Sequence, residues 1–182
     1  MRPTPDLVKQ AVFNSLGERV QGAKVLELFA GTGALSLECL SRGAVSAVCV
    51  EKAHRHAEVL RQNALAAGFP SNCLQVRTQD VFAVIAQLET TGEKYDLIMA
   101  DPPYGEKNVG RRSTSLAQSL LDDERLPGLL TENGLVILGH SKRDTLDIPA
   151  RWHEKKMLKH GDNVMRFFES LSGSIGGAEG FR

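Results

Sequence analysis

The sequence has no net charge, because its 22 lysines and arginines balance 22 aspartates and glutamates. Proteins that bind nucleic acid usually carry a basic excess, so this chain could bind one only through a local basic patch. Two stretches could supply such a patch, KNVGRR at 107–112 and RWHEKKMLKH at 151–160. Each could equally be a solvent-exposed loop or strand face.

Long apolar runs and paired cysteines are also missing. No apolar stretch approaches the roughly 20 residues that cross a membrane, and MRPTPDLVKQ at the N-terminus has no apolar core of a secretory signal. The cysteines, Cys39, Cys49 and Cys73, form no CxxC pair and lie in apolar stretches. This pattern favours buried free thiols over a metal site or disulfides and suits a reducing, cytoplasmic setting.

The length of 182 residues suits one domain with one core, which we expect over residues 1–169. Residues 170–182, SLSGSIGGAEGFR, are rich in glycine and serine. We expect them to form a flexible C-terminal tail.

Short apolar runs alternate with amphipathic segments along most of the chain. The runs predict buried strands and the segments between them predict helices. This alternation predicts a Rossmann-like α/β fold, with a mostly parallel seven-stranded sheet, helices on both faces and a C-terminal antiparallel hairpin. The predicted strands are 24–29, 46–50, 73–77, 95–100, 134–140, 152–159 and 163–169. The predicted helices are 5–16, 34–43, 53–67, 81–89 and a broken helical region at 115–130.

The first helix is expected to have Thr4 as its N-cap and Pro5 as its first helical residue, and to stop at Gly17. Its apolar residues fall on one face, as do those of the helix at 53–67. We therefore expect both faces to be buried, including Leu7 in the first helix and Leu65 in the other.

Four acidic residues lie at or near the ends of the predicted parallel strands: Glu27, Glu51, Asp80 and Asp101. In open α/β sheets, ligands bind at the carboxyl ends of the strands. One carboxylate in such a place commonly caps the next helix. Four of them in register predict a ligand site at this edge of the sheet.

The turn Phe29-Ala30-Gly31-Thr32-Gly33 follows the first strand and lets the backbone approach a ligand closely. A P-loop would need a lysine and a hydroxyl after the second glycine, where Ala34-Leu35 stand instead. A dinucleotide site would match the spacing from this turn to Glu51, but Ser36 replaces the third glycine of its fingerprint.

S-adenosyl-L-methionine fits the acidic residues better than a dinucleotide, which would leave two of them without a role. It carries no phosphate, and it presents an ammonium, a ribose diol and an adenine amine. Glu27 is placed for the ammonium, Glu51 for the ribose hydroxyls and Asp80 for the adenine amine. An α/β domain without a cofactor remains the alternative.

The sequence ADPPYG at 100–105 closes the strand predicted at 95–100. Pro102 and Pro103 cannot continue a helix or a central strand, so this could be a plain turn. Beside a methyl donor it has a second interpretation. The Asp101 carboxylate and the Pro102 carbonyl could hold the two N–H bonds of an exocyclic amine, and Tyr104 could stack on an extruded base.

The motifs ELFAGTG and DPPY, with Glu51 and Asp80, resemble the class I S-adenosylmethionine-dependent N-methyltransferases that act on amino groups of nucleobases. More narrowly, RPTPDLVKQAVFNSL resembles the RPT-x-D-x-x-[RK]-x-x-x-F-N-x-L signature of the RsmD-type methylases. KHGDNVMRFFE resembles the Y-G-D-T-x-[VL]-x-F-F end of that family. The match spans about residues 2–169. It implies methylation of the N2 amine of a guanine in 16S ribosomal RNA, with S-adenosyl-L-homocysteine as the product.

The resemblance also implies roles for individual residues. Cofactor contacts are implied for Glu27, Phe29, Gly31, Gly33, Glu51 and Asp80, and the acceptor site for Asp101, Pro102 and Tyr104. Arg2, Pro3 and Thr4 are implied to fold over the cofactor pocket. We also expect Ala30, Thr32, Lys52, Val81 and Asp101 to contact the cofactor. Pro103 is expected to belong to the acceptor site. Arg111 and Arg112 are expected to contact the RNA.

Two departures from the family pattern shape the expected partners. Members usually carry a short basic segment before RPT, where this chain has Met1, and Asn163 and His160 replace a frequent Thr and Tyr. Phosphate contacts supply much of nonspecific RNA binding, so we expect poor binding to naked RNA. The expected partner is 16S ribosomal RNA within a small-subunit particle, with no membrane, no metal and the chain as a monomer.

Three other functions stay open at this point. One is methylation of another amine, on DNA adenine N6 or protein glutamine, since such enzymes share DPPY. Another is a non-catalytic RNA-binding module for particle assembly. The third is a dinucleotide oxidoreductase.

Overall fold

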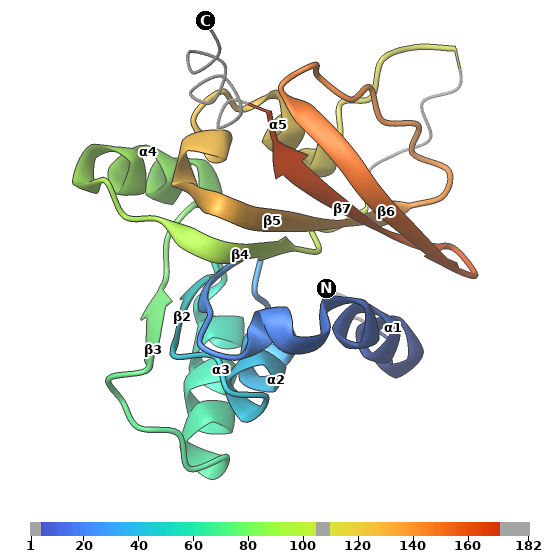
Figure 1. Cartoon of the computed structure of the whole chain (residues 1–182). Helices are drawn as coiled ribbons and strands as arrows, with labels where there is room; N and C mark the ends of the chain where they lie inside the picture. Colours follow the sequence, from blue (N-terminus) through green and yellow to red (C-terminus); the bar gives the residue numbers. More distant parts are fainter. Residues whose placement is uncertain (1–4, 105–109, 172–182) are drawn as a thin grey trace, which may run out of the picture.

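The structure is a computed structural model that describes residues 5–104 and 110–171. Its strands form one seven-stranded sheet in the order β3-β2-β1-β4-β5-β7-β6 (Figure 1). The strands are β1 Lys24–Leu28, β2 Ser46–Val50, β3 Leu74–Arg77, β4 Tyr95–Ala100, β5 Leu130–Ser141, β6 Trp152–His160 and β7 Asn163–Ser170. The first five pair in parallel, and β7 runs antiparallel to both β5 and β6. The predicted mostly parallel sheet with a C-terminal antiparallel hairpin is confirmed.

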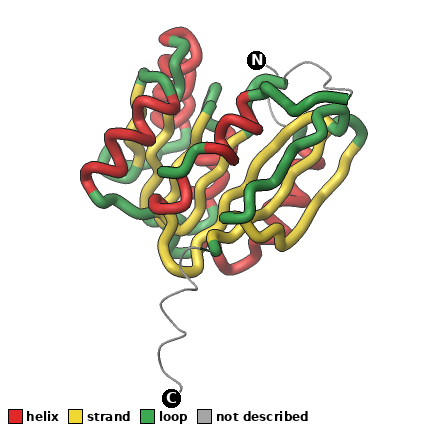
Figure 2. Tube along the Cα trace, turned by 90° about the horizontal axis from the view of Figure 1, so that it is seen from above, coloured by secondary structure: helices red, strands yellow, loops and turns green. Residues whose placement is uncertain are grey.

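Helices cover both faces of the sheet, as Figures 1 and 2 show. The helices are α1 Asp6–Leu16, α2 Ala34–Ser41, α3 His54–Ala66, α4 Val81–Thr91 and α5 Leu116–Asp122, with short 3₁₀ helices η1 Gly17–Val20 and η2 Leu126–Leu129. One hydrophobic cluster joins the sheet to α1 and α2, and another joins it to α4, α5 and η2. The sheet is therefore buried from both sides.

The central strand β4 shows why its sequence is a continuous apolar run. Leu97 and Met99 belong to the cluster with α1 and α2, whereas Ile98 and Ala100 belong to the cluster with α4 and α5. Successive side chains of a strand point to opposite faces, so a strand covered on both sides needs apolar residues at every position.

The helix boundaries and faces differ from the prediction in small ways. Pro5 is the N-cap of α1 rather than its first helical residue, and Thr4 lies outside the described residues. Leu7 is 71% exposed and Leu65 is 77% exposed, so neither belongs to a buried face. Each helical residue turns about 100°, and the buried stripes centre on their neighbours Val8 and Ala64, which carries Leu7 and Leu65 out of the interface.

The other differences lie between β4 and the hairpin. Strand β5 begins at Leu130, earlier than the predicted residue 134, because Leu130 pairs with Tyr95 before a register shift. The helical region at 115–130 is interrupted at 123–125 rather than at Pro127, which is instead the second residue of η2. A proline is acceptable there because the first residues of a helix need no N–H partner within it.

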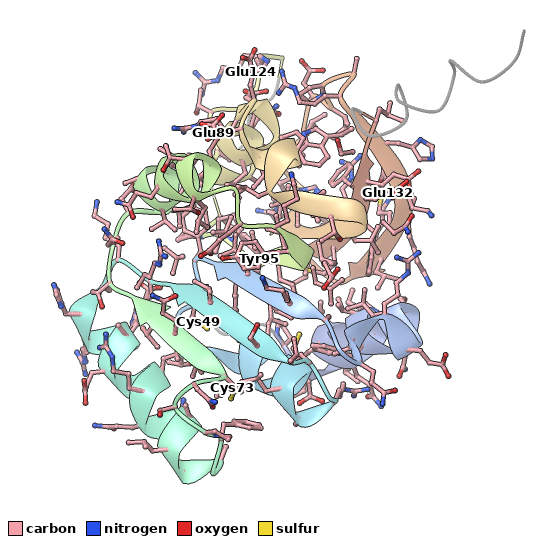
Figure 3. All side chains as sticks on the ribbon, turned by 60° about the vertical axis from the view of Figure 1, so that its left-hand side comes forward. Cys49, Cys73, Glu89, Tyr95, Glu124 and Glu132 are labelled. Atoms are coloured by element: carbon pink, nitrogen blue, oxygen red, sulfur yellow. The ribbon has the colours of Figure 1, made fainter. Side chains whose placement is uncertain are left out.

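The cysteines are free thiols, as predicted, but the burial predicted for all three holds only for Cys39 and Cys49. Cys39 and Cys49 are buried and Cys73 is partly exposed; Figure 3 labels the latter two near β2 and β3. Burial raises the pKa of the Cys39 and Cys49 thiols far above their ordinary range, so both stay protonated and unreactive. Within the described residues, no helix has the length and apolarity that crossing a membrane requires.

Candidate active site

The candidate site lies where β1, β2 and β4 end side by side. Leu28, the last residue of β1, pairs with Val50 of β2 and with Ala100 of β4. The next residues along these strands therefore start at one edge of the sheet. They include Glu51 and Asp101, as predicted from the sequence.

Glu27 is buried one residue before that edge, at 3% exposure. Its Oε1 accepts hydrogen bonds from the Ser36 backbone N at 2.9 Å and from Ser36 Oγ at 2.6 Å. Burial raises the pKa of Glu27 to about 8. The hydrogen bonds from Ser36 lower this pKa, and the nearby negative charges of Asp101 and Glu51 raise it further. A positive ligand group placed beside Glu27 would favour its charged form and lower this pKa.

Ser36 was missed as a functional residue from the sequence, where it stood only as the replacement of a fingerprint glycine. It lies in the first turn of α2 and ties that helix to β1 through Glu27. The sequence signal that could have indicated this role was a hydroxyl residue three positions after the second glycine of the turn, combined with a carboxylate near the end of the preceding strand.

The glycine turn has an unusual backbone. Phe29 has a φ of 56°, the one positive value among the described non-glycine residues, and Gly31 and Gly33 also have positive φ. Such strain in a non-glycine residue is typical of functional sites. A Cβ at Gly33 would lie 2.7 Å from Leu60 Cγ, so this glycine lets α3 pack against the turn. Ala30 is buried and Thr32 is partly exposed within the same turn.

Glu51 holds the turn in place. It is 6% exposed, its Oε1 accepts from Gly31 N at 2.9 Å, and its Oε2 accepts from Ala53 N at 2.8 Å. His56 Nδ1 lies 4.0 Å from Oε2. A carboxylate has about four lone-pair positions, so two positions remain for other donors such as hydroxyls. Lys52, the next residue, is exposed.

Asp80 acts as the N-cap of α4. Its Oδ2 accepts from Phe82 N at 3.0 Å and from Ala83 N at 3.2 Å. This is the capping role that a single strand-end carboxylate commonly has, and it leaves Oδ1 available on an exposed side chain. Val81, the first residue of α4, is buried in the core cluster.

Asp101 lies against β5. Ala100 pairs with Leu138, which brings Asp101 beside Gly139. A Cβ on Gly139 would contact Asp101 Oδ1 and would lie 2.9 Å from both Asp101 Cγ and Met165 Sδ. Because Gly139 has no side chain, the Asp101 carboxylate can occupy this space. The sequence did not indicate this role.

Tyr104 is tied to the hairpin. Its hydroxyl donates a hydrogen bond to Asn163 Oδ1, at the start of β7, and its side chain is 40% exposed. A narrow crevice lies next to it; the lining residues are Pro102, Pro103, Tyr104, Ser115, Ala117, Gly139, His140, Ser141 and Asp144. Asn163, noted from the sequence as a departure, thus contacts the acceptor motif directly.

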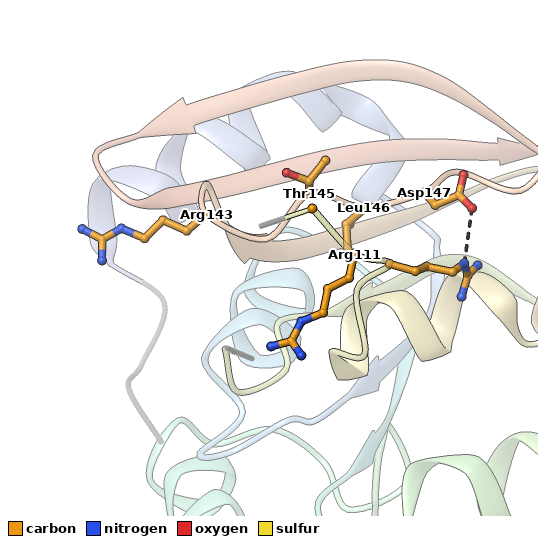
Figure 4. A pocket seen from close by; sticks show the side chains of 7 residues that line it. Arg111, Arg143, Thr145, Leu146 and Asp147 are labelled. Carbon is orange, nitrogen blue, oxygen red and sulfur yellow. Dashed lines mark hydrogen bonds and ion pairs between the residues drawn. The ribbon is translucent and has the colours of Figure 1, made fainter. Parts of the chain in front are cut away.

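A larger, basic cavity of about 720 Å³ includes Arg111, Arg112 and Arg143 in its lining (Figure 4). Arg112 forms a bidentate pair with Asp122, both contacts at 2.7 Å, and its Nε lies 3.3 Å from Asp147. These contacts raise the pKa of Arg112 and lower that of Asp122. Arg112 is therefore engaged within the protein, which argues against the predicted phosphate contact.

Figure 4 shows Arg111 extending away from Asp147, on the side toward Arg143. Arg143 was not predicted as a site residue, and its exposed side chain brings a second guanidinium to this cavity. Arg2, Pro3 and Thr4, predicted to cover the cofactor, lie outside the described residues. On the other predicted basic patch, Lys155 pairs with Glu169 at 3.5 Å.

Known proteins resemble this chain in sequence and in fold. The sequence profile of the family described as conserved hypothetical protein 95 matches residues 1–169. Ribosomal RNA small subunit methyltransferase D of Escherichia coli K12 is 29% identical over 170 residues, which cover 93% of this chain and 79% of that protein.

Solved structures share the fold. A hypothetical protein of Thermus thermophilus superposes with a TM-score of 0.75 at 26% identity, over 92% of this chain and 88% of that chain. An RNA methyltransferase from Salinibacter ruber, in complex with S-adenosyl-L-homocysteine, superposes with a TM-score of 0.66 at 17% identity, over 93% and 94% of the two chains. At that identity the second likeness shows the fold alone.

Proposed function

The chain belongs to the family described as conserved hypothetical protein 95, and we propose that it is an S-adenosyl-L-methionine-dependent methyltransferase of ribosomal RNA. The finer proposal is that it methylates the N2 amine of a guanine in 16S ribosomal RNA. The small-subunit methylase of Escherichia coli, similar over most of its length, supports the substrate class.

The observation that carries the proposal is the convergence of Glu27, Glu51 and Asp101 beside the glycine turn. Burial raises the pKa of Glu27 to about 8, and the charges of Asp101 and Glu51 add to that effect. Three acidic side chains so close together favour a ligand with positive charge. S-adenosyl-L-methionine has two such groups, an ammonium and a sulfonium, and it supplies the methyl group when bound.

Each residue then has a defined task. The free lone-pair positions of Glu51 accept the ribose hydroxyls, while its two backbone contacts keep the turn in shape. Oδ1 of Asp80 accepts the adenine amine while Oδ2 caps α4. Glu27, fixed by Ser36, provides the negative charge beside the amino acid end.

The acceptor side is built for positioning rather than for strong base catalysis. The lone pair of an exocyclic amine is delocalised into the ring, so it must be turned toward the methyl group. Asp101 and the Pro102 carbonyl accept the two N–H bonds, and the proline pair fixes their spacing. Tyr104, held by Asn163, presents its ring to the base. The amine loses its proton after the methyl group has moved.

RNA recognition in this proposal depends on Arg111 and Arg143. The cavity that they line is formed by residues 110–112, which follow the acceptor motif, and by residues 143–147, which follow β5. It lies next to the crevice at Tyr104. Guanidinium groups suit bidentate contacts to phosphate. Because the net charge is zero, two arginines give weak affinity, and a folded ribosomal particle in the cytoplasm is the substrate that can present a guanine in an exposed loop.

The decisive experiment maps modified nucleotides by mass spectrometry in ribosomal RNA from cells that lack this protein. We expect one N2-methylguanine to be missing from 16S ribosomal RNA. The parent protein should restore it, whereas Asp101→Asn, which keeps the size of the side chain but loses its charge, should not. A missing modification in the large-subunit RNA, in DNA or in a protein, or no missing modification, would contradict the finer proposal.

A further inference from the structure

His140 is a buried polar residue next to the acceptor motif that the proposed chemistry leaves without a role. It is 5% exposed and lies near the carboxyl end of β5, where it pairs with Val164 of β7. Ala100, the last residue of β4, pairs with Leu138, two residues before His140. His140 lines the same crevice as Pro102 and Tyr104.

The hydrogen bonding of the ring fixes which nitrogen carries the proton. Nδ1 lies 2.8 Å from the backbone carbonyl of Ser141, and a carbonyl oxygen can only accept, so Nδ1 donates. Burial lowers the pKa of His140, an effect that the positive charge of Arg166 strengthens and that contacts with Ser141 and Asp144 oppose. The ring is therefore neutral near pH 7, and Nε2 is a bare acceptor.

Nε2 of His140 is buried and has no hydrogen-bond partner among the residues that the structure describes. A buried acceptor left unpaired costs free energy, and such groups call for an explanation. A histidine kept only for packing would be better replaced by an apolar residue. An acceptor beside Pro102 instead fits a donor on the substrate.

We propose that His140 Nε2 accepts a hydrogen bond from the N1–H of the base whose N2 amine is held by Asp101 and Pro102. This rests on the proposed function. Guanine presents N1–H directly beside its N2 amine, so a base whose amine is held at Asp101 and Pro102 would carry its N1–H toward the crevice that Pro102 and His140 line. Adenine presents a bare N1 acceptor at the corresponding ring position, which would face Nε2 lone pair to lone pair. His140 thereby selects guanine.

The test uses small-subunit particles reconstituted with 16S ribosomal RNA that carries guanine or 2,6-diaminopurine at the mapped position. Diaminopurine keeps the N2 amine but has an unprotonated N1. The parent protein should methylate guanine particles faster. His140→Leu should lower kcat/KM on guanine particles at least about tenfold and bring the ratio of the two rates toward one. Its affinity for S-adenosyl-L-methionine in calorimetry should stay at the parent value.

His140→Gln serves as the second variant, because its amide can either accept from guanine N1–H or donate to the N1 of diaminopurine. It should keep most of the guanine rate and raise the diaminopurine rate. His153→Leu is the matched control, since His153 is exposed and pairs with Glu169 at the far end of the hairpin.

An unchanged ratio of guanine to diaminopurine rates in His140→Gln, or in folded His140→Leu, overturns the inference while the proposed function stands. Loss of cofactor affinity in both variants at unchanged melting temperature also overturns it, since His140 would then act through the cofactor site. Failure of the parent protein to methylate guanine particles instead contradicts the proposed function.

Discussion

The Asp101 carboxylate at the end of β4 occupies the space beside Gly139 that any larger residue of β5 would fill. An added Cβ would contact Asp101 Oδ1 and would lie 2.9 Å from Met165 Sδ on the neighbouring strand β7. Gly139 does not have a positive φ, so close approach rather than backbone conformation requires a glycine here. A glycine inside a strand often marks such a place.

This contact predicts the effect of Gly139→Ala. The new methyl group should push the Asp101 carboxylate away from the amine position, which lowers kcat for methyl transfer at least about tenfold, equivalent to about 1.4 kcal/mol. Cofactor affinity should change much less. Methyl incorporation into particles and calorimetry measure the two effects separately. Gly128→Ala is the matched control, because a Cβ there meets nothing within 4 Å. Full activity of Gly139→Ala would mean that the position of Asp101 is unimportant.

Glu27 predicts a pH dependence of stability. Its pKa rises from 4.5 to about 8 on folding, because of burial. The folded state therefore binds the proton more tightly, and this stabilising contribution is present below about pH 4.5 and is lost as the pH rises toward about 8. Glu27→Gln removes the titration. Urea unfolding should show that the variant loses less stability than the parent between pH 5 and pH 8. Parallel curves for the two proteins would contradict the buried titration.

The same group predicts proton release when the cofactor binds. A positive ligand beside Glu27 favours its carboxylate form, and much of the free protein holds the proton at pH 7. Binding of S-adenosyl-L-methionine should therefore release protons, seen in calorimetry as a binding enthalpy that differs between phosphate and Tris buffers. The difference should shrink in Glu27→Gln. Equal enthalpies in both buffers for the parent protein would show that Glu27 is not beside the positive groups.

Glu51 predicts a loss of cofactor affinity. Removing its carboxylate in Glu51→Ala deletes the proposed ribose acceptors and the contacts to Gly31 and Ala53, which should weaken binding by roughly 1–3 kcal/mol. Glu58→Ala is the control, because Glu58 is exposed on the adjacent helix α3 and pairs with Arg61 at 3.8 Å. Calorimetry gives both affinities. An affinity of Glu51→Ala equal to that of the control would remove Glu51 from the site.

The fold could be predicted from the sequence because its signals are local. The apolar run of β4 marks a strand covered on both faces, and the acidic residues after the strands follow directly from chain order. The hairpin was predicted because the last two strands break that alternation, whereas the order of the strands in the sheet was not predicted. Helix faces were less well predicted, since one step of about 100° separates buried Val8 from exposed Leu7.

The contacts that the sequence did not reveal join segments far apart in the chain. Tyr104 meets Asn163, Asp101 meets Gly139, and Arg112 meets Asp122 and Asp147. Sequence position alone showed that Arg111 and Arg112 follow the acceptor turn, but not that Arg112 pairs with Asp122 and Asp147. Arg143 and His140 likewise reach the site only because β5 lies beside β4.

The last prediction concerns RNA. Arg111 and Arg143 line one cavity beside the acceptor motif together with Arg112, which two carboxylates hold. The double variant Arg111→Glu/Arg143→Glu should therefore lose activity on small-subunit particles. Its RNA affinity should also depend less on salt, because two phosphate contacts disappear. The slope of log affinity against log salt concentration should become shallower by about one to two.

The matched control is Arg19→Glu/Lys94→Glu, which makes the same change in net charge. Arg19 lies in η1 and Lys94 directly precedes β4, so both stand at the amino ends of the strands, away from the proposed site. The control should keep the salt slope and most of the activity of the parent. Arg112→Ala, which breaks the pairs with Asp122 and Asp147, should lower the melting temperature without changing that slope.

Substrate form provides the second half of this test. Methyl incorporation is measured on naked 16S ribosomal RNA and on assembled small-subunit particles across a salt series. We expect a clear preference for particles, because two arginines on a chain of zero net charge hold unstructured RNA weakly. Equal rates on both substrates would refute the particle requirement. A double variant with the parent's activity and salt slope would place the RNA contacts on another surface, such as the exposed face of β6.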